Sequence, residues 1–228
     1  AREVARQSIV LLKNKDKLLP LKKDIRTLAV IGPNADNVYN MLGDYTAPQA
    51  DGTVVTVLDG IRQKVSKETR VLYAKGCAVR DSSRTGFKDA IETARNADAV
   101  VMVMGGSSAR DFSSEYEETG AAKVTINQIS DMESGEGYDR ATLHLMGRQL
   151  ELLEEISRLG KPVVLVLIKG RPLLMEGAIQ EAEAIVDAWY PGMQGGNAVA
   201  DVLFGDYNPA GRLTLSVPRS VGQLPVYY

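Results

Sequence analysis

The sequence is poor in the residues that most often build metal centres and disulfide bonds. Its 228 residues include one cysteine, Cys77, and one histidine, His144. A single cysteine excludes a disulfide bond within the chain, and neither residue has a second copy with which to begin a zinc site or a serine–histidine relay. Cys77 follows a predicted strand, where we expect a small buried thiol rather than a nucleophile. His144 is expected to be structural or on the surface, and no cofactor is expected.

The sequence also lacks a strong charge of either sign and a long apolar run. The formal net charge of -2 at pH 7 provides no general attraction to phosphate polymers or anionic lipid. No apolar stretch approaches the ~20 residues that span a bilayer, and residues 1–21 form an amphipathic pattern rather than a secretion signal. We therefore expect no nucleic acid and no membrane among the partners. What is present, 44% hydrophobic and 25% charged residues, is ordinary globular composition.

Short apolar runs rich in Val, Ile and Ala, mostly closed by glycine, recur along the chain. They span residues 27–32, 70–76, 98–106, 161–170 and 183–192. Continuous apolarity of this length is typical of strands covered on both faces, as in a parallel sheet. A last run, residues 212–218, alternates with a period of two and is expected to form an edge strand or to run antiparallel.

Helix-like segments lie between these runs. A helix with an apolar face that includes Leu11 and Leu12 is expected to begin near Arg2, and others are expected over residues 56–65, 85–97, 147–160 and 196–205. The alternation predicts an α/β fold, a three-layer α/β/α sandwich of about six mostly parallel strands, one of which can be an antiparallel edge strand. A length of 228 residues fits a single domain over residues 1–228. Because that domain would begin on a helix with no strand before it, we expect it to be part of something longer.

One connection is much longer than the others. Residues 106–146 follow a predicted strand without a clear helical or strand period, whereas most connections in compact domains have ~4–6 residues. In doubly wound sheets, ligands gather outside the carboxyl ends of the strands. This insertion begins at such an end, which makes it the first place to look for chemistry.

The insertion contains the motif SDMESGEGYDR, residues 130–140. A solvated acidic surface loop is the simplest interpretation of such a charged run. Glu136, however, lies between Gly135 and Gly137, whose missing side chains let the backbone approach another surface closely. Tyr138 adds stacking area and a hydroxyl group. A carboxylic acid on such a loop, with its pKa raised by partial burial, could protonate a leaving oxygen.

Six segments resemble, in order, the second domain of glycoside hydrolase family 3, the β-glucosidases and β-xylosidases. They are SIVLLKNKDKLLPL, LAVIGPNAD, SGEGYDRATLHLMGRQLELLEEI, GKPVVLVLIKGRPL, AWYPGMQGGNAVADVLFGDYNPAGRLTLSVP and GQLPVYY. The resemblance covers essentially the whole chain. It implies an α/β sandwich that lends a loop to a sugar pocket, next to an N-terminal (β/α)8 barrel domain that carries an aspartate nucleophile.

The resemblance also implies that Glu136, the glutamate of SGEG, is the general acid/base. Retaining glycosidases need a nucleophilic carboxylate and, ~5–5.5 Å away, a second one that first donates and then accepts a proton. A long loop with glycines, reaching out from a neighbouring domain, suits the second role. Glu133 remains a rival because it is only three residues away. Asp139 and Arg140 are expected to orient the loop through an ion pair rather than to react.

A second candidate region is the loop after the first parallel strand. Residues 43–53, GDYTAPQADGT, can face the same cleft, with Asp44 or Tyr45 near a substrate. An ordinary turn is the alternative interpretation.

No part of the sequence resembles the barrel of the family, so the nucleophile is expected to be absent from these 228 residues and the chain alone to have negligible glycosidase activity. Within a larger enzyme it would supply the acid/base of a retaining exo-acting β-glycosidase. The implied substrates are oligosaccharides with terminal non-reducing β-linked glucosyl or xylosyl units. The alternative is a non-catalytic carbohydrate-binding or structural α/β domain. The resemblance points to a periplasmic or secreted protein.

Overall fold

The computed structural model of the chain describes residues 1–109, 118–119, 131–223 and 225–226. Within these ranges one mixed sheet has the strand order β1-β6-β5-β4-β2-β3. Strands β2 to β6 run parallel, and β1 pairs antiparallel with β6. The strands are β1 (Val10–Asn14), β2 (Thr27–Ile31), β3 (Arg70–Ala74), β4 (Ala99–Gly105), β5 (Val163–Ile168) and β6 (Ala184–Trp189).

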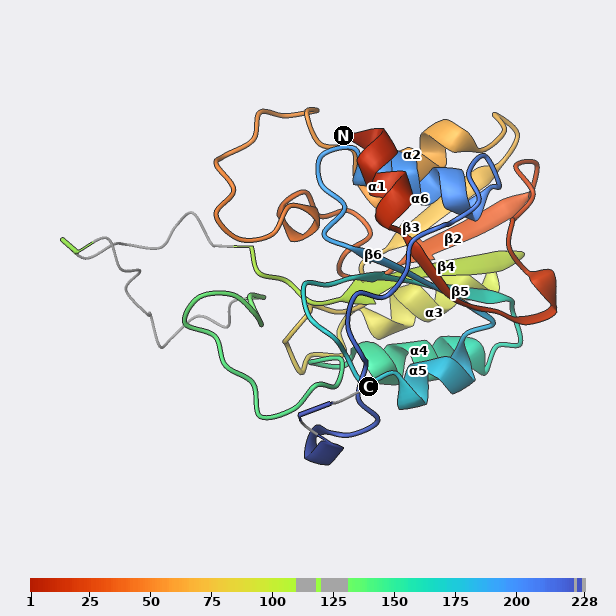
Figure 1. Cartoon of the computed structure of the whole chain (residues 1–228). Helices are drawn as coiled ribbons and strands as arrows, with labels where there is room; N and C mark the ends of the chain where they lie inside the picture. The colour runs from red at the N-terminus through yellow and green to blue at the C-terminus, as the bar shows by residue number, and fades with distance from the viewer. Residues whose placement is uncertain (110–117, 120–130, 224, 227–228) are drawn as a thin grey trace.

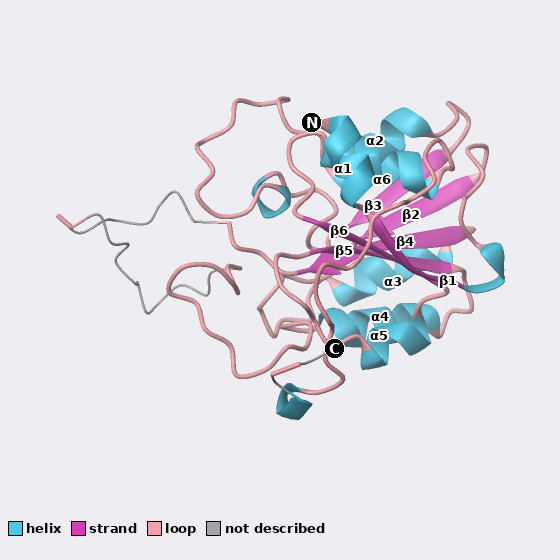
Figure 2. Ribbon diagram, viewed as in Figure 1, coloured by secondary structure: helices cyan, strands magenta, loops and turns pink. Residues whose placement is uncertain are grey.

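Helices cover both faces of the sheet, which confirms the predicted three-layer α/β/α sandwich (Figures 1 and 2). The helices on one face are α1 (Arg2–Ser8), α2 (Val57–Lys64) and α6 (Gly195–Leu203). Those on the other face are α3 (Phe87–Arg95), α4 (Gln149–Ser157) and α5 (Glu176–Glu181). Short 3-10 turns cover Lys15–Lys17, Tyr39–Met41 and Val221–Gln223.

The central strands are apolar without interruption because each of them supplies two separate cores. In β4, Val101 and Val103 join the core beside α2 and α6, whereas Val100, Met102 and Met104 join the core beside α3 and α4. Successive side chains of a strand point to opposite faces, so a strand buried on both sides needs an apolar residue at every position. Full burial of one such side chain contributes about 1.5–3 kcal/mol.

The glycines that close two of these strands let the chain leave the sheet in close contact with its neighbours. Gly32 and Gly105 have positive φ angles of 131° and 132°. A Cβ atom on Gly32 would overlap the carbonyl oxygen of Val103, and one on Gly105 would overlap that of Ile168. The loops after β2 and β4 therefore begin directly at the carboxyl edge of the sheet, and the described parts of residues 32–56 and 106–146 extend from that edge (Figure 1).

The antiparallel edge strand is not the one that the sequence predicts. Residues 212–218 do not form a strand, although their period-2 pattern favoured one; Leu213 and Leu215 remain partly exposed. The edge strand is β1 instead. The expected first helix ends at Ser8, because Ile9 turns to an extended conformation with ψ 131°, and the chain then pairs with β6. Helix α5, six residues long with only Ala178 buried, was not predicted.

Candidate functional site

Glu136 lies at the tip of a turn formed by residues 131–140, which we call the Glu136 turn. Gly135 and Gly137 flank it with φ angles of 110° and 81°, a region that side chains strongly disfavour. The three residues at the tip are exposed to solvent. The hydroxyl of Tyr45 donates a hydrogen bond to the carboxylate of Glu136, and the amide of Glu136 donates a long one of 3.5 Å to Oδ2 of Asp44. The structure thus brings together two segments that are 91 and 92 residues apart in the sequence.

Tyr45 is held in an unusual backbone conformation beside Glu136. Its φ angle is 57°, in the left-handed region that non-glycine residues rarely adopt. Its own amide donates to Oδ1 of Asp44 at 2.8 Å, and its side chain is 76% exposed. Such conformations cost of order 1–3 kcal/mol and concentrate at functional sites. The loop over residues 43–53 thus contacts the carboxylate of the Glu136 turn through a residue in a strained backbone conformation.

Glu133 has the opposite environment, although it belongs to the same turn. Only 2% of Glu133 is exposed, and its carboxylate forms an ion pair with Arg140, whose side chain is 4% exposed. Arg140 also donates a hydrogen bond to the carbonyl oxygen of His144. The expectation that Asp139 and Arg140 orient the loop through an ion pair is met by Arg140 only, because its partner is Glu133. Asp139 lies exposed to solvent, and Tyr138 is half-buried.

A chain of buried hydrogen bonds attaches the turn to the sheet. The amides of Glu133 and Ser134 donate to the carbonyl oxygen of Ser107 at 2.8 and 3.2 Å. The hydroxyl of Ser107 donates to the side-chain oxygen of Asn40 at 2.6 Å, and the amide group of Asn40 donates to the side-chain oxygen of Asn34 at 2.7 Å. These bonds connect the loops after β2 and β4. Sequence reasoning missed Ser107, Asn40 and Asn34; the available signal was a polar side chain shortly after a buried strand.

The loop after β3 holds the first residues of the turn. Oδ1 of Asp131 accepts hydrogen bonds from the amides of Val79 and Arg80 at 3.0 and 3.4 Å. The guanidinium of Arg80 donates to the carbonyl oxygen of Met132 at 2.7 Å and lies 5.9 Å from the ring centroid of Tyr138. Arg80 was also missed, because nothing in its own segment distinguishes it from a surface arginine.

A second buried ion pair lies at the ends of β5 and β6. Nζ of Lys169 is 2.6 Å from Oδ2 of Asp187, with side-chain exposures of 3% and 1%, and 4.0 Å from the ring centroid of Trp189. Burial raises the pKa of Asp187, and the charge of Lys169 opposes that rise. The next residue, Tyr190, places its hydroxyl 3.2 Å from Oγ of Ser134. The end of β6 that holds this ion pair therefore also contacts the Glu136 turn, through Tyr190 and Ser134.

The lone cysteine and histidine lie where the sequence predicts. Cys77 is buried, and burial raises the pKa of its thiol to about 12, which makes it a poor nucleophile at neutral pH. His144 is exposed. Over the described ranges, no group of three or more His, Cys, Asp or Glu side chains is arranged to hold a metal ion. In the same part of the chain, no helix has the length and apolarity to cross a membrane.

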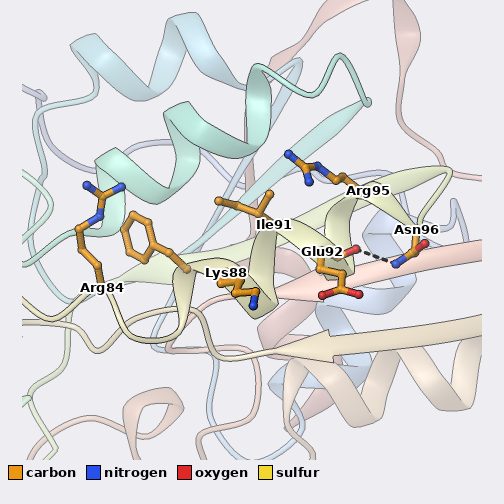
Figure 3. Close-up of a pocket in the computed structure, with 7 residues that line it drawn as sticks. Arg84, Lys88, Ile91, Glu92, Arg95 and Asn96 are labelled. Atoms are coloured by element: carbon orange, nitrogen blue, oxygen red, sulfur yellow. Dashed lines mark hydrogen bonds between the residues drawn. The ribbon is translucent and has the colours of Figure 1, made fainter.

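A hollow of about 720 Å³ lies along α3 (Figure 3). It is lined by residues of α3 and by residues just before and just after that helix, and no residue of the Glu136 turn contributes to it. The lining residues are Arg84, Phe87, Lys88, Ile91, Glu92, Arg95 and Asn96. The hollow is separate from the residues that surround Glu136.

Known proteins resemble this chain over its full length. It is 44% identical over 235 residues to a β-xylosidase from Formosa agariphila and 40% identical over 248 residues to a periplasmic β-glucosidase from Salmonella typhimurium. Each comparison covers 100% of the chain but only 29% of the relative, so the chain spans less than a third of these proteins.

Solved structures also match the whole chain and extend well beyond it. A β-glucosidase from Erythrobacter marinus superimposes with a TM-score of 0.82 at 37% identity, and a β-glucosidase from Listeria innocua in complex with glucose with a TM-score of 0.79 at 30% identity. Both cover 100% of this chain, which corresponds to 31% and 28% of those proteins.

The family model described as the glycosyl hydrolase family 3 C-terminal domain matches residues 9–228. With this match and with relatives of 40% identity or more, the chain belongs to glycoside hydrolase family 3, as a C-terminal domain of that family.

Proposed function

We propose that this chain is the acid/base domain of a retaining, exo-acting β-glycosidase, and that Glu136 is its general acid/base. The relatives that contain such a domain are β-xylosidases and β-glucosidases. The observation that carries the proposal is the position of Glu136. An exposed carboxylate stands at the tip of a turn whose base is anchored to the carboxyl edge of the sheet, where ligands bind in this class of fold.

Burial supports Glu136 over Glu133. An acid that protonates a leaving oxygen has to come within hydrogen-bond distance of it. Glu133 is 2% exposed and paired with Arg140, so a sugar oxygen could reach its carboxylate only after the ion pair had opened. Glu136 is exposed, so a sugar oxygen can approach its carboxylate from solvent.

The proposed reaction has two steps, and Glu136 acts in both. In the first step, a nucleophilic carboxylate attacks the anomeric carbon while the protonated Glu136 donates its proton to the departing oxygen. In the second step, the Glu136 carboxylate accepts a proton from the water that releases the sugar. The hydrogen bond from Tyr45 keeps the carboxylate oriented while it changes its protonation state.

The nucleophile is proposed to come from a (β/α)8 barrel domain outside these residues. This agrees with the share of the relatives that the chain leaves unmatched, since it spans 29% of the first two. The proposed substrates are terminal, non-reducing β-linked glucosyl or xylosyl units. The chain by itself is then expected to have negligible activity, because it supplies only one of the two carboxylates.

Leaving-group dependence tests the role of Glu136. In the full-length protein that contains this domain and its barrel, Glu136→Gln should lower turnover of a disaccharide or an alkyl glycoside by about 10²- to 10⁴-fold. Turnover of a dinitrophenyl glycoside in the first step should change far less, because this leaving group departs without protonation. Asp139→Asn is the matched control, since Asp139 is exposed in the same turn; it should show no such dependence.

A carbohydrate-binding module is the competing function, and the same experiment separates the two. A binding role predicts that Glu136→Gln raises KM equally for all substrates and leaves kcat unchanged. That result would contradict the proposed acid/base role.

A further inference from the structure

We infer that the buried ion pair between Glu133 and Arg140 is the positioning element of the Glu136 turn: it closes the base of the turn and fixes where the acid/base carboxylate points. This inference rests on the proposed role of Glu136. Neither residue of the pair is expected to contact the substrate, so both are positioning residues rather than catalytic ones.

The pair joins the two sides of the turn on either side of its tip. Glu133 is three residues before Glu136, and Arg140 is four residues after it. The side chains of Glu133 and Arg140 are 1% and 4% exposed, whereas Glu136 between them is exposed to solvent. A buried ion pair therefore lies at the protected base of the turn, and the carboxylate of Glu136 lies at its accessible tip.

Arginine fits this position better than lysine would. The guanidinium of Arg140 donates both to the carboxylate of Glu133 and to the carbonyl oxygen of His144. A planar guanidinium can hold two acceptors at once in a fixed geometry, whereas a lysine ammonium acts as a point charge on a flexible stem. Arg140 thus fixes the direction of the chain that enters the turn and of the chain that leaves it.

Close packing confines Glu133 to this geometry. A Cβ atom on Gly106 would overlap the carboxylate of Glu133, so the backbone after β4 lies directly against that side chain. The backbone amide of Glu133 donates to the carbonyl oxygen of Ser107 at 2.8 Å. The ion pair is therefore packed against the end of a central strand.

The pair is also sensitive to the loss of one partner. Within the described part of the chain, Oε1 of Glu133 is buried without a hydrogen-bond partner, which leaves Arg140 as the main compensation for the buried charge. Removal of one partner of a buried pair leaves an uncompensated charge, whereas replacement of both partners by neutral groups is often tolerated. The effects of substituting Glu133 and of substituting Arg140 should therefore be strongly non-additive.

Amide hydrogen exchange tests the positioning directly, without reference to catalysis. In the full-length protein, Arg140→Met should accelerate exchange of the amides of residues 134–139 by tenfold or more, on the order of the coupling seen for residues in contact, and leave β4 and β5 unchanged. Glu133→Gln combined with Arg140→Met should return exchange most of the way to the parent value. Arg148→Met is the matched control, because Arg148 forms an exposed ion pair with Glu151 at 3.0 Å.

Kinetics of the same variants test the consequence for Glu136. Arg140→Met should lower kcat for a disaccharide by roughly 10- to 100-fold, the scale of a small misplacement of a reacting group. It should lower kcat/KM for a dinitrophenyl glycoside much less, because kcat/KM reports the first step and this leaving group departs without protonation. The double variant should recover part of the loss, and Arg140→Lys should lie between the parent and Arg140→Met.

Two results would overturn the inference. One is unchanged exchange of residues 134–139 in Arg140→Met; the other is an equal loss of kcat/KM on both substrates together with a lowered Tm, which would give the pair a purely structural role. Failure of the proposed function is a different result: the effect of Glu136→Gln on activity would not depend on the leaving group. The exchange measurement would still report on the turn.

Discussion

Two carboxylates of this molecule, Asp201 in α6 and Glu136 at the carboxyl edge of the sheet, lie in opposite environments, one suited to a structural role and the other to the proposed catalytic role. Asp201, 1% exposed, accepts hydrogen bonds from Arg2 at 2.7 and 2.5 Å and from Lys64 at 2.5 Å. It thereby links α1 and α2 to α6. Glu136 is exposed and accepts from a neutral hydroxyl, that of Tyr45. Arg2, Arg6 and Lys64 surround Asp201, whereas Glu136 stands where a ligand can approach it from solvent.

The pKa of Asp201 reflects this contrast. Burial alone would raise the pKa of its carboxyl, but the hydrogen bonds and charges of Arg2 and Lys64 outweigh burial and hold the pKa below its usual value. The neighbouring Asp206 has a pKa of about 2, because Lys23 and Lys64 both donate hydrogen bonds to it. The cations around Asp201 and Asp206 thus favour the charged forms of both carboxyl groups.

The largest expected effect comes from removing the buried carboxylate. Asp201→Ala should lower the free energy of unfolding by about 3 kcal/mol, the lower end for a broken buried ion pair, because Arg2 and Arg6 can regain water. Glu136→Ala should change it by less than about 0.5 kcal/mol, as expected for an exposed side chain. Urea unfolding of both variants measures the difference. Equal effects on stability would remove the contrast between the two carboxylates.

A smaller effect is expected from removing one cation of the cluster. Arg2→Met should destabilise the protein by about 1–2 kcal/mol, the scale of a hydrogen bond to a charged group. Lys64 at 2.5 Å and Arg6 at 3.7 Å would still compensate Asp201. The same unfolding experiment measures this value, and kcat per folded molecule should not change. A loss as large as that of Asp201→Ala would show that Arg2 alone compensates Asp201.

The pH dependence of stability sharpens the comparison further. The pKa values of Asp201 and Asp206 are lower in the folded protein than in the unfolded chain, where Asp titrates near ~3.9. Their contribution is complete above the unfolded value and is lost as the pH falls toward about 2, the folded pKa of Asp206. Unfolding measured from pH 6 to pH 2 should therefore show decreasing stability, with a shallower slope in Asp201→Asn. An unchanged slope in that variant would contradict the assignment.

The smallest effect is expected at Cys77. Burial raises the pKa of its thiol to about 12, so the thiolate that reacts with iodoacetamide is nearly absent at pH 8. The folded protein should remain unmodified by mass spectrometry, and the protein unfolded in urea should gain one adduct. Rapid modification of the folded protein would show that the loop after β3 opens easily.

The central sheet was predictable from the sequence because its strands are apolar at every position. The runs at 98–106 and 161–170 became β4 and β5, whose residues fill cores on both faces. The edges were not predictable in this way. Residues 10–14 continue the apolar pattern of the preceding helix, and only pairing with β6 makes them a strand. Residues 212–218 have the alternation of a strand, but they lack a paired neighbour within the described ranges.

The tip of the Glu136 turn was predictable from the sequence, but the contacts at its base were not. Two glycines around Glu136 mark a tight exposed turn in the sequence itself. The partner of Arg140 was not evident, because Glu133 and Asp139 are both close in sequence and only the fold decides which of them is buried. The contact of Ser107 with Asn40 joins residues 67 positions apart, and no local pattern encodes it.

Rescue by azide tests the central claim, that Glu136 is the acid/base, most directly. In Glu136→Ala of the full-length protein, a dinitrophenyl glycoside should still form the glycosyl-enzyme, but water should release the sugar slowly without a general base. Azide needs no base, so it should accelerate turnover and yield a β-glycosyl azide. No acceleration by azide in Glu136→Ala, with acceleration in Glu133→Ala, would contradict the account and assign the acid/base to Glu133.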